Sequence, residues 1–241
     1  MSTHFRIART LPRFVATGGG GSTYDSALTA LSPSARWKLD DTTGATAVAT
    51  VGSDGTYTSM TFGALGNPGL VSDGGTAVIT AGGSTSQFVQ LPLPTLTTAG
   101  TFILWSAHGN GGSSGLPIWR DNTSAGGTGW FQDISGTNPL VRINGTSHTV
   151  SSVVASTLRT GSRHLYILTT DGSSVKFYID GTVVDTWTKS AAFSTMNDSI
   201  LLGRNGANSA TATYGGTYDD VSIVNSAITG TDVTNLWNAG K

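Results

Sequence analysis

Hydrophobic and polar positions alternate with a period of two over much of the chain, which is the pattern of strands with one buried face. The clearest stretch is HLYILTTDGSSVKFYIDGTVVDTW (164–187), where two Asp-Gly pairs separate three alternating runs. Because Asp-Gly between such runs is a hairpin turn signal, the stretch predicts an antiparallel meander of three strands. Within it, Val175, Phe177 and Ile179 share one face and Asp180 lies on the other.

Three further runs extend the strand pattern. TFILW (101–105) is short and largely apolar, as expected of a strand covered on both faces. SILLGRN (199–205) is a second short apolar strand that ends in glycine, and GTYDDVSIVN (216–225) predicts the last strand. The chain is therefore expected to be all-β.

The last predicted strand contains two adjacent aspartates. Regular alternation would place Asp219 and Asp220 on opposite faces, with Asp219 in phase with Val221 and Ile223. Asp219 would then need a partner, which is a metal, a backbone amide or an arginine. Asp220 would be a solvated neighbour.

Two short helices are predicted beside the strands, near 25–32 and near 230–238. Pro33 stops the first, and Gly240 stands at the expected C-cap of the second. The expected N-terminal capping residues are Asp25 or Ser26 for the first helix, and Thr229 with Asp232 for the second.

Residues 1–22 differ in composition from residues 23–241, which form the predicted domain. The segment contains no acidic residue and ends in the flexible sequence TGGGG (17–21). It is either a frayed terminus or an arm that docks in a partner's groove, with aromatic anchors and with arginines that pair with carboxylates. The residues that would make this docking contact are Phe5, Arg6, Arg9, Arg13 and Phe14.

Composition supports the all-β prediction. All fourteen acidic residues are aspartate and none is glutamate. Aspartate favours turns and caps whereas glutamate favours helix interiors, so this usage is typical of strands joined by turns. Glycine, at 33 residues, is about twice as frequent as its usual share of roughly 7%.

Charge and cysteine content exclude several classes of function. The net charge is −1 and only 11% of residues are charged, so a general attraction to nucleic acid or to anionic membranes is not expected. No apolar run reaches about 18 residues, and no apolar segment follows the basic start, so neither a membrane span nor a secretory signal is predicted. Without cysteine there are no disulfides and no thiolate metal sites.

Seven segments, taken in order, resemble the laminin-G-like, concanavalin A-like jelly-roll family over roughly residues 30–240. The most specific are the meander with its YIDG turn and the closing DDVSIVNSAIT sequence. The segments are RWKLDDTTGATA (36–47), GTYTS (55–59), FVQLP (88–92), TFILWSAHG (101–109), HLYILTTDGSSVKFYIDGTVV (164–184), ILLGRNG (200–206) and GTYDDVSIVNSAITGTDVTNLWNAG (216–240). The resemblance implies two antiparallel sheets packed face to face.

The opening TYDSALTALSPSARWKLDDTTG (23–44) is also similar to the entry into such domains in virion proteins of tailed bacteriophages. This resemblance implies a structural minor tail or decoration protein that is assembled in the host cytoplasm, in several copies or as a homo-oligomer. Residues 1–22 would anchor it to other virion proteins, and the sandwich would contact host cell-surface glycan. The alternative is an independent carbohydrate-binding module.

Catalysis is not expected. Related glucanases use a Glu-x-Asp-x-Glu strand motif, which a chain without glutamate lacks, and no aspartate pair has the spacing to replace it. The one Gly-x-Ser-x-Gly match, GGSSG (111–115), lies in a glycine-rich stretch with no predicted helix after it, so it lacks the strand-to-helix context of a nucleophile elbow. His108, His148 and His164 are therefore expected to be surface residues.

The family resemblance implies a possible calcium site, with Asp219 as its ligand. Many relatives add an aspartate from a Asp-x-Ser-Gly-Asn loop, and Ala49 stands at that position here. Loss of a carboxylate weakens an oxygen cage, although Asp54, or Asp40 and Asp41, would compensate if they lay close to it.

A glycan site is predicted where aromatic and polar residues cluster between two glycine-rich stretches. Sugar binding needs an aromatic face for stacking, with polar groups around it. The candidate contacts are Trp119, Arg120, Trp130 and Asp133. Trp37 and Trp105, inside strand patterns, are expected in the core.

Overall fold

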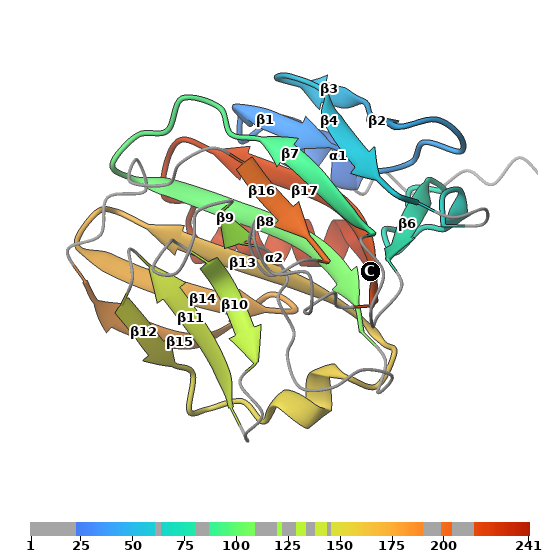
Figure 1. Cartoon of the computed structure of the whole chain (residues 1–241). Helices are drawn as coiled ribbons and strands as arrows, with labels where there is room; N and C mark the ends of the chain where they lie inside the picture. The colour runs from blue at the N-terminus through green and yellow to red at the C-terminus, as the bar shows by residue number, and fades with distance from the viewer. Residues whose placement is uncertain are drawn as a thin grey trace, which may run out of the picture.

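The computed structural model describes residues 23–60, 64–80, 87–108, 120–121, 129–133, 138–143, 146–189, 199–203 and 215–241. Two antiparallel sheets face each other and form the sandwich in Figure 1. Two α-helices and one 3-10 helix, η1 (Ala155–Leu158), complete the described part of the chain. The predicted two-sheet, all-β fold is confirmed.

Each sheet is built from strands that are far apart in the sequence. Sheet A runs in the order β15 (Thr182–Thr188), β14 (Ser174–Ile179), β13 (Arg163–Thr170), β8 (Gly100–Ala107), β17 (Gly216–Val224), β1 (Ala35–Trp37) and β3 (Ala49–Val51), with β6 (Thr76–Thr80) on β17 and β5 (Asn67–Pro68) on β6. Sheet B runs in the order β12 (Thr146–Thr149), β11 (Pro139–Ile143), β10 (Gly129–Asp133), β9 (Arg120–Asp121), β16 (Ser199–Leu202), β7 (Phe88–Pro92), β4 (Gly55–Thr58) and β2 (Thr46–Ala47).

Strands β13, β14 and β15 form the predicted meander, with Leu168 paired to Phe177 and Phe177 paired to Asp185. Val175, Phe177 and Ile179 are buried together between the sheets. Alternation in the sequence therefore predicts both the strands and the side that each residue faces.

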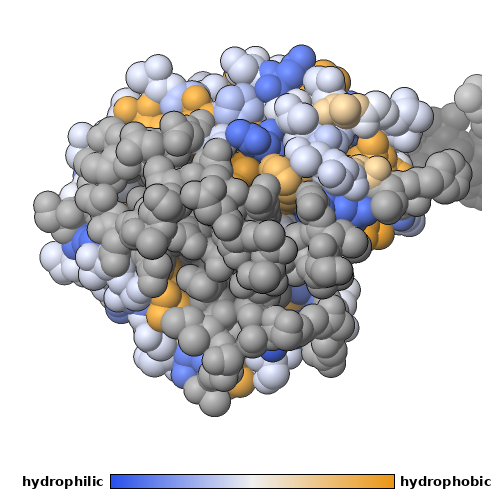
Figure 2. Space-filling model, in the orientation of Figure 1, coloured by the Kyte–Doolittle hydropathy of each residue, from blue (hydrophilic) through white to orange (hydrophobic). Residues whose placement is uncertain are grey.

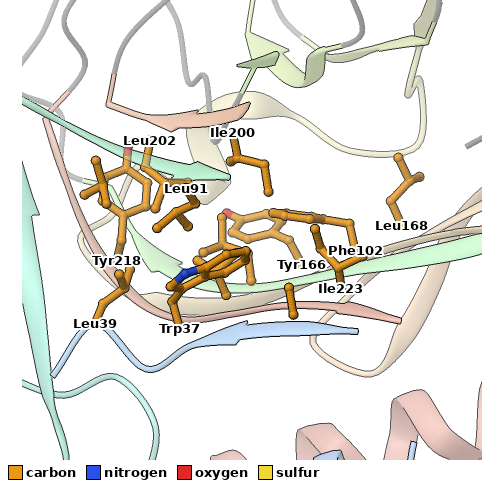
Figure 3. Close-up of a cluster of buried hydrophobic side chains, with 14 of the residues drawn as sticks. Trp37, Leu39, Leu91, Phe102, Tyr166, Leu168, Ile200, Leu202, Tyr218 and Ile223 are labelled. Atoms are coloured by element: carbon orange, nitrogen blue, oxygen red, sulfur yellow. The ribbon is translucent and has the colours of Figure 1, made fainter. Parts of the chain in front are cut away.

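The main core fills the space between the two sheets, and we call it the inter-sheet core. Figure 3 shows its side chains converging from strands of both sheets. Members of this core include Trp37, Leu39, Leu91, Phe102, Leu104, Tyr166, Leu168, Ile200, Leu202, Tyr218, Val221 and Ile223. Trp37 is buried, as predicted, and its indole N–H donates to the carbonyl of Ser53 at 2.9 Å.

A second core, the helix-side core, lies on the outer face of sheet A beneath both α-helices. Its members include Tyr24, Leu28, Val71, Ile103, Trp105, Leu165, Ile167, Tyr178, Val224, Val233 and Leu236. Because Phe102 and Leu104 face one core while Ile103 and Trp105 face the other, β8 is covered on both sides. This arrangement explains why the run from Phe102 to Trp105 is apolar at every position.

Helix α1 (Tyr24–Thr29) begins earlier than predicted. Its N-cap is Thr23, whose hydroxyl accepts from the backbone N–H of Ser26 at 3.3 Å, so the predicted caps are wrong. Asp25 is not a cap because its carboxylate binds Arg36 and Lys38 instead. The helix ends before Pro33, as expected.

Helix α2 (Gly230–Gly240) starts with the predicted capping box. The Thr229 hydroxyl accepts from the Asp232 backbone N–H at 3.2 Å, and the Asp232 carboxylate accepts from the Thr229 N–H at 2.9 Å. The helix runs two residues past the predicted end, so Gly240 is its last residue and the C-cap is Lys241, not Gly240 as predicted. No helix among the described residues is long and apolar enough to cross a membrane.

Edge strands β12 and β15 lie on the same side of the sandwich (Figure 1), where side chains connect them. His148 Nε2 bonds to Asp185 Oδ2 at 2.9 Å, and the His148 ring stacks on Trp187 with the ring centroids 4.0 Å apart. The Ser152 hydroxyl donates to the Val184 carbonyl, and the Thr186 N–H donates to Asp185 Oδ1 at 2.7 Å.

On the face shown in Figure 2, the described residues present scattered hydrophobic atoms between hydrophilic ones. The large hydrophobic side chains that are exposed in the described part of the chain are Val48, Val51, Ile79, Val154 and Val183.

Candidate functional site

The aspartate pair on β17 sits at a β-bulge. Asp219 pairs with Trp105 and Val221 pairs with Leu104, so Asp220 has no partner on β8 and takes a positive φ of 44°. One extra residue shifts the alternation, so that Tyr218 and Val221 both enter the inter-sheet core. The prediction that Asp219 is in phase with Val221 is therefore wrong.

Both aspartates point to the helix side of sheet A, which corrects the prediction that they lie on opposite faces. Asp219 Oδ2 accepts from the backbone N–H groups of Leu70 at 2.6 Å and Val71 at 3.0 Å. Asp220 binds Arg36, which also binds Asp25 of α1. Sequence reasoning missed this arrangement because a bulge has no clear signal where no glycine stands at the bulged position, and here that position is Asp220.

Asp220 is 1% exposed, so the expectation of a solvated residue is also wrong. Arg36 Nε donates to both Asp220 carboxylate oxygens at 3.2 Å, and Ser222 donates to Oδ1 at 3.1 Å. Burial lowers the pKa of Arg36, but hydrogen bonds to Asp220 and then Asp25 raise it above its ordinary value. The group is an ion-pair network, buried at Arg36 and Asp220, that ties α1 to sheet A through the more exposed Asp25.

Asp219 is the predicted calcium ligand, and its surroundings are those of a backbone anchor. Burial raises its pKa to about 7, and the N–H groups of Val71 and Leu70 offset only part of that effect. The two N–H dipoles place positive charge at the oxygen that a cation would bind. The geometry favours an anchor, and the calcium site stays a prediction.

Two of the proposed compensating acids, Asp41 and Asp54, have other partners. Asp41 Oδ2 accepts from the Val48 N–H at 3.1 Å and from the Tyr57 hydroxyl at 2.8 Å. Asp54 Oδ1 accepts from the N–H of Ala49 at 2.8 Å. In the described part of the chain, no three His, Cys, Asp or Glu side chains form a group that would hold a metal ion.

Three of the predicted glycan contacts, Arg120, Trp130 and Asp133, lie on two neighbouring strands of sheet B. Arg120 in β9 pairs with Gly129 in β10, directly before Trp130, and Asp133 ends β10. The fold therefore brings this part of the chain together on one sheet. Trp119 lies outside the described residues, as do the docking residues Phe5, Arg6, Arg9, Arg13 and Phe14.

The histidines are less exposed than predicted. His108 is 1% exposed, and burial lowers its pKa to about 4, so it is neutral at pH 7. Its Nε2 lies 3.1 Å from the Ser106 hydroxyl, while its Nδ1 faces the carbonyl of Gly215 and not a carboxylate. The surface prediction is wrong for this residue.

His164 bonds through Nδ1 to Asp180 Oδ2 at 2.7 Å, and only 14% of its side chain is exposed. The signal for this pair was present in the sequence. The predicted hairpin places Tyr166 opposite Ile179, which brings His164 close to Asp180. His148 is half-buried against Trp187.

The two-sheet sandwich, with both described α-helices on the outer face of sheet A, defines a concanavalin A-like jelly-roll domain. The chain belongs to the concanavalin A-like lectin/glucanases superfamily, because the Laminin_G_3 family model matches residues 81–234. No curated protein matches the sequence significantly.

Several solved structures share this fold. Domain 4 of AbnA, a GH43 extracellular arabinanase of Geobacillus stearothermophilus, is 20% identical with a TM-score of 0.53, and the match covers 85% of this chain and 97% of that one. The botulinum neurotoxin serotype D binding domain is 11% identical with a TM-score of 0.60, over 85% of this chain and 51% of that one.

The Trypanosoma rangeli sialidase in complex with sialic acid is 7% identical with a TM-score of 0.57, over 84% of this chain. The match covers 32% of that enzyme, so this chain spans about a third of its length. At these identities the likeness shows the fold alone.

Proposed function

We propose that this protein is a non-catalytic glycan-binding domain. The observation that carries the proposal is the match to domain 4 of AbnA, which covers 97% of a domain described in complex with arabinotriose. Membership of a superfamily of lectins and glucanases supports the same class of ligand. The proposed ligand class is therefore a neutral oligosaccharide or cell-surface polysaccharide.

The site that we propose is on sheet B, at strands β9 and β10. Arg120, Trp130 and Asp133 lie in strands of sheet B, whereas helices α1 and α2 pack on the outer face of sheet A (Figure 1). Trp130 would supply a stacking face for a sugar ring, with Arg120 and Asp133 as hydrogen-bonding groups. Trp119 is the remaining proposed contact.

The absence of catalysis is part of the proposal. Glycoside hydrolysis uses two carboxylates that flank the scissile bond. The chain has no glutamate, and the buried Asp219 and Asp220 are bonded to backbone N–H groups and to Arg36 respectively. We expect no turnover of the glycan that it binds.

A glycan array followed by isothermal titration tests the site. We expect saturable binding that Trp130→Ala weakens about five- to 150-fold, because loss of stacking on an aromatic face costs about 1–3 kcal/mol by analogy with base stacking. Trp237→Phe is the matched control. Trp237 lies on α2, which packs on sheet A, so this variant should bind the glycan normally. Equal binding by W130A and the parent would contradict the site, and no binding to any glycan would contradict the function.

A virion role is the second candidate. The similarity of residues 23–44 to entry segments of tailed-phage virion proteins and the basic, aromatic composition of residues 1–22 favour it. In this case, deletion of residues 1–22 should abolish incorporation into particles and leave the sandwich folded by circular dichroism. Particles that keep the truncated protein at normal copy number would reject the anchoring role.

A further inference from the structure

A groove of about 520 Å³ lies between α1 and α2. Its volume falls within the roughly 300–1,000 Å³ that is typical of ligand pockets. The α1 side contributes the apolar residues Ala27, Ala30 and Leu31. The α2 side contributes a polar stripe of Asp232, Asn235 and Asn238, which recur every three residues along the helix.

The chemistry of the groove suits a peptide segment. Asn235 and Asn238 are exposed, and their side-chain amides have no hydrogen-bond partner among the described residues. Each side-chain amide offers donors and an acceptor, which is what an extended backbone needs. The apolar α1 side would take hydrophobic side chains. The one charged lining residue, Asp232, is acidic and favours a basic segment.

We propose that this groove binds residues 1–22 of the same chain. The segment has three arginines and no acid, with two phenylalanines among them, and so complements both sides of the groove. It leads directly into α1, whose N-cap is Thr23, and the groove lining starts at Ser26. The segment itself lies outside the described residues.

Tethering makes the same chain the favoured source of this segment. The five residues TGGGG (17–21) span about 12 Å as a flexible linker, which is more than two turns of helix. A short flexible linker gives a docking segment an effective concentration in the millimolar range. Contact within the chain therefore outcompetes a second copy at ordinary protein concentrations.

The proposal extends beyond glycan binding and does not depend on it. A partner that binds the N-terminal segment must first displace it from the groove. Affinity for that partner is then reduced by the fraction of chains in which the segment is docked.

The test places a nitroxide label beside the groove in the full chain. Because the chain has no cysteine, Thr234→Cys on the exposed side of α2 takes a single label, and Thr146→Cys on β12 of sheet B is the matched control. Amide NMR peaks of residues 4–14 should weaken strongly with T234C and keep their intensity with T146C. Unchanged peaks with T234C would overturn the proposal.

Two further samples separate the alternatives. In the first sample, nitroxide-labelled chains without ¹⁵N are mixed with ¹⁵N chains that carry no nitroxide, and the peaks of the N-terminal segment should keep their intensity. Weakened peaks in this mixture would assign the groove to the segment of a second copy and would reject the same-chain proposal. Replacing Arg6, Arg9 and Arg13 by glutamate should restore the peaks with T234C, whereas lysine at these positions should not. Weakening that survives the glutamate substitutions would refute the charge complementarity on which the proposal rests.

Discussion

Two neighbouring aspartates on β17 have different partners, and one extra residue in the strand explains both. Without the bulge, one carboxylate would enter the inter-sheet core, where no described cation lies. With the bulge, Asp219 reaches the Leu70 and Val71 amides, and Asp220 reaches Arg36. Apolar periodicity predicts the strand, but it cannot predict where the alternation skips one residue.

Asp220→Ala should be strongly destabilising, because it leaves the Arg36 charge buried and short of its main partner. Breaking a buried ion pair by removing one member costs about 3–5 kcal/mol. Urea unfolding measures the change. The double variant Arg36→Met with Asp220→Leu should regain much of the loss, since a well-packed apolar pair avoids burying an unpaired charge. A loss below 1 kcal/mol for D220A would contradict this account.

Asp219 should give the stability a pH dependence. Its folded pKa of about 7 exceeds its ordinary value of 3.8, so its contribution is present below pH 4 and is lost as the pH rises through 7. Asp219→Asn cannot titrate. The stability of the parent minus that of D219N should therefore fall by at most about 3–4 kcal/mol between pH 4 and pH 8.

His108 gives the free energy of unfolding a pH dependence of the opposite sign between about pH 4 and pH 6.5. Its pKa is lowered to about 4, so its contribution is present above pH 6.5 and is lost as the pH falls toward 4. The parent and D219N both contain His108, so its effect cancels in the difference between their unfolding free energies. A difference that stays constant with pH would contradict the pKa assigned to Asp219.

At the scale of elements, the sequence predicts the start of helix α2 but not its end. Thr229 and Asp232 identify the start, because the capping box is local chemistry. The end depends on tertiary contacts, since Gly240 packs against Trp105 and Tyr24. Helix α1 was misplaced for the same reason, because the partners of Asp25 lie on β1 and just after it.

Gly240→Ala should destabilise the protein although alanine is the better helix former. A β-carbon at this position would lie 2.5 Å from Trp105 Cζ2, and overpacking of this kind costs about 1–3 kcal/mol. Gly230→Ala at the other end of α2 is the control, because nothing lies within 4 Å of its added carbon. Thermal unfolding should show a lower Tm for G240A only, and equal Tm values would contradict the packing argument.

At the scale of the whole molecule, sequence reasoning predicted the two sheets, the meander and the apolar β8. These features depend on alternation, which acts along one strand at a time. The ion pairs between distant elements escaped prediction, because Arg36 and Asp220 are separated by 184 residues. The glycan site stays a prediction, although the fold places Arg120 and Trp130 on paired strands.

The contact between β12 and β15 should contribute to the stability of the sandwich. His148→Phe keeps the stacking on Trp187 and loses the bond to Asp185, whereas His148→Ala loses both. We expect losses of about 1 kcal/mol for H148F and about 2 kcal/mol for H148A in urea unfolding at pH 7.5. Equal values for the two variants would show that the ring stacking contributes nothing.

The side-chain bonds along β15 bear on how the protein behaves when concentrated. A free edge strand is a template on which other chains add strands and aggregate. Here Ser152 occupies the carbonyl of Val184, and Asp185 occupies the N–H of Thr186. An incoming strand would have to displace groups already bonded within the molecule. These bonds therefore protect the β15 edge against fibril growth, a role that a proline in the edge strand has in other proteins.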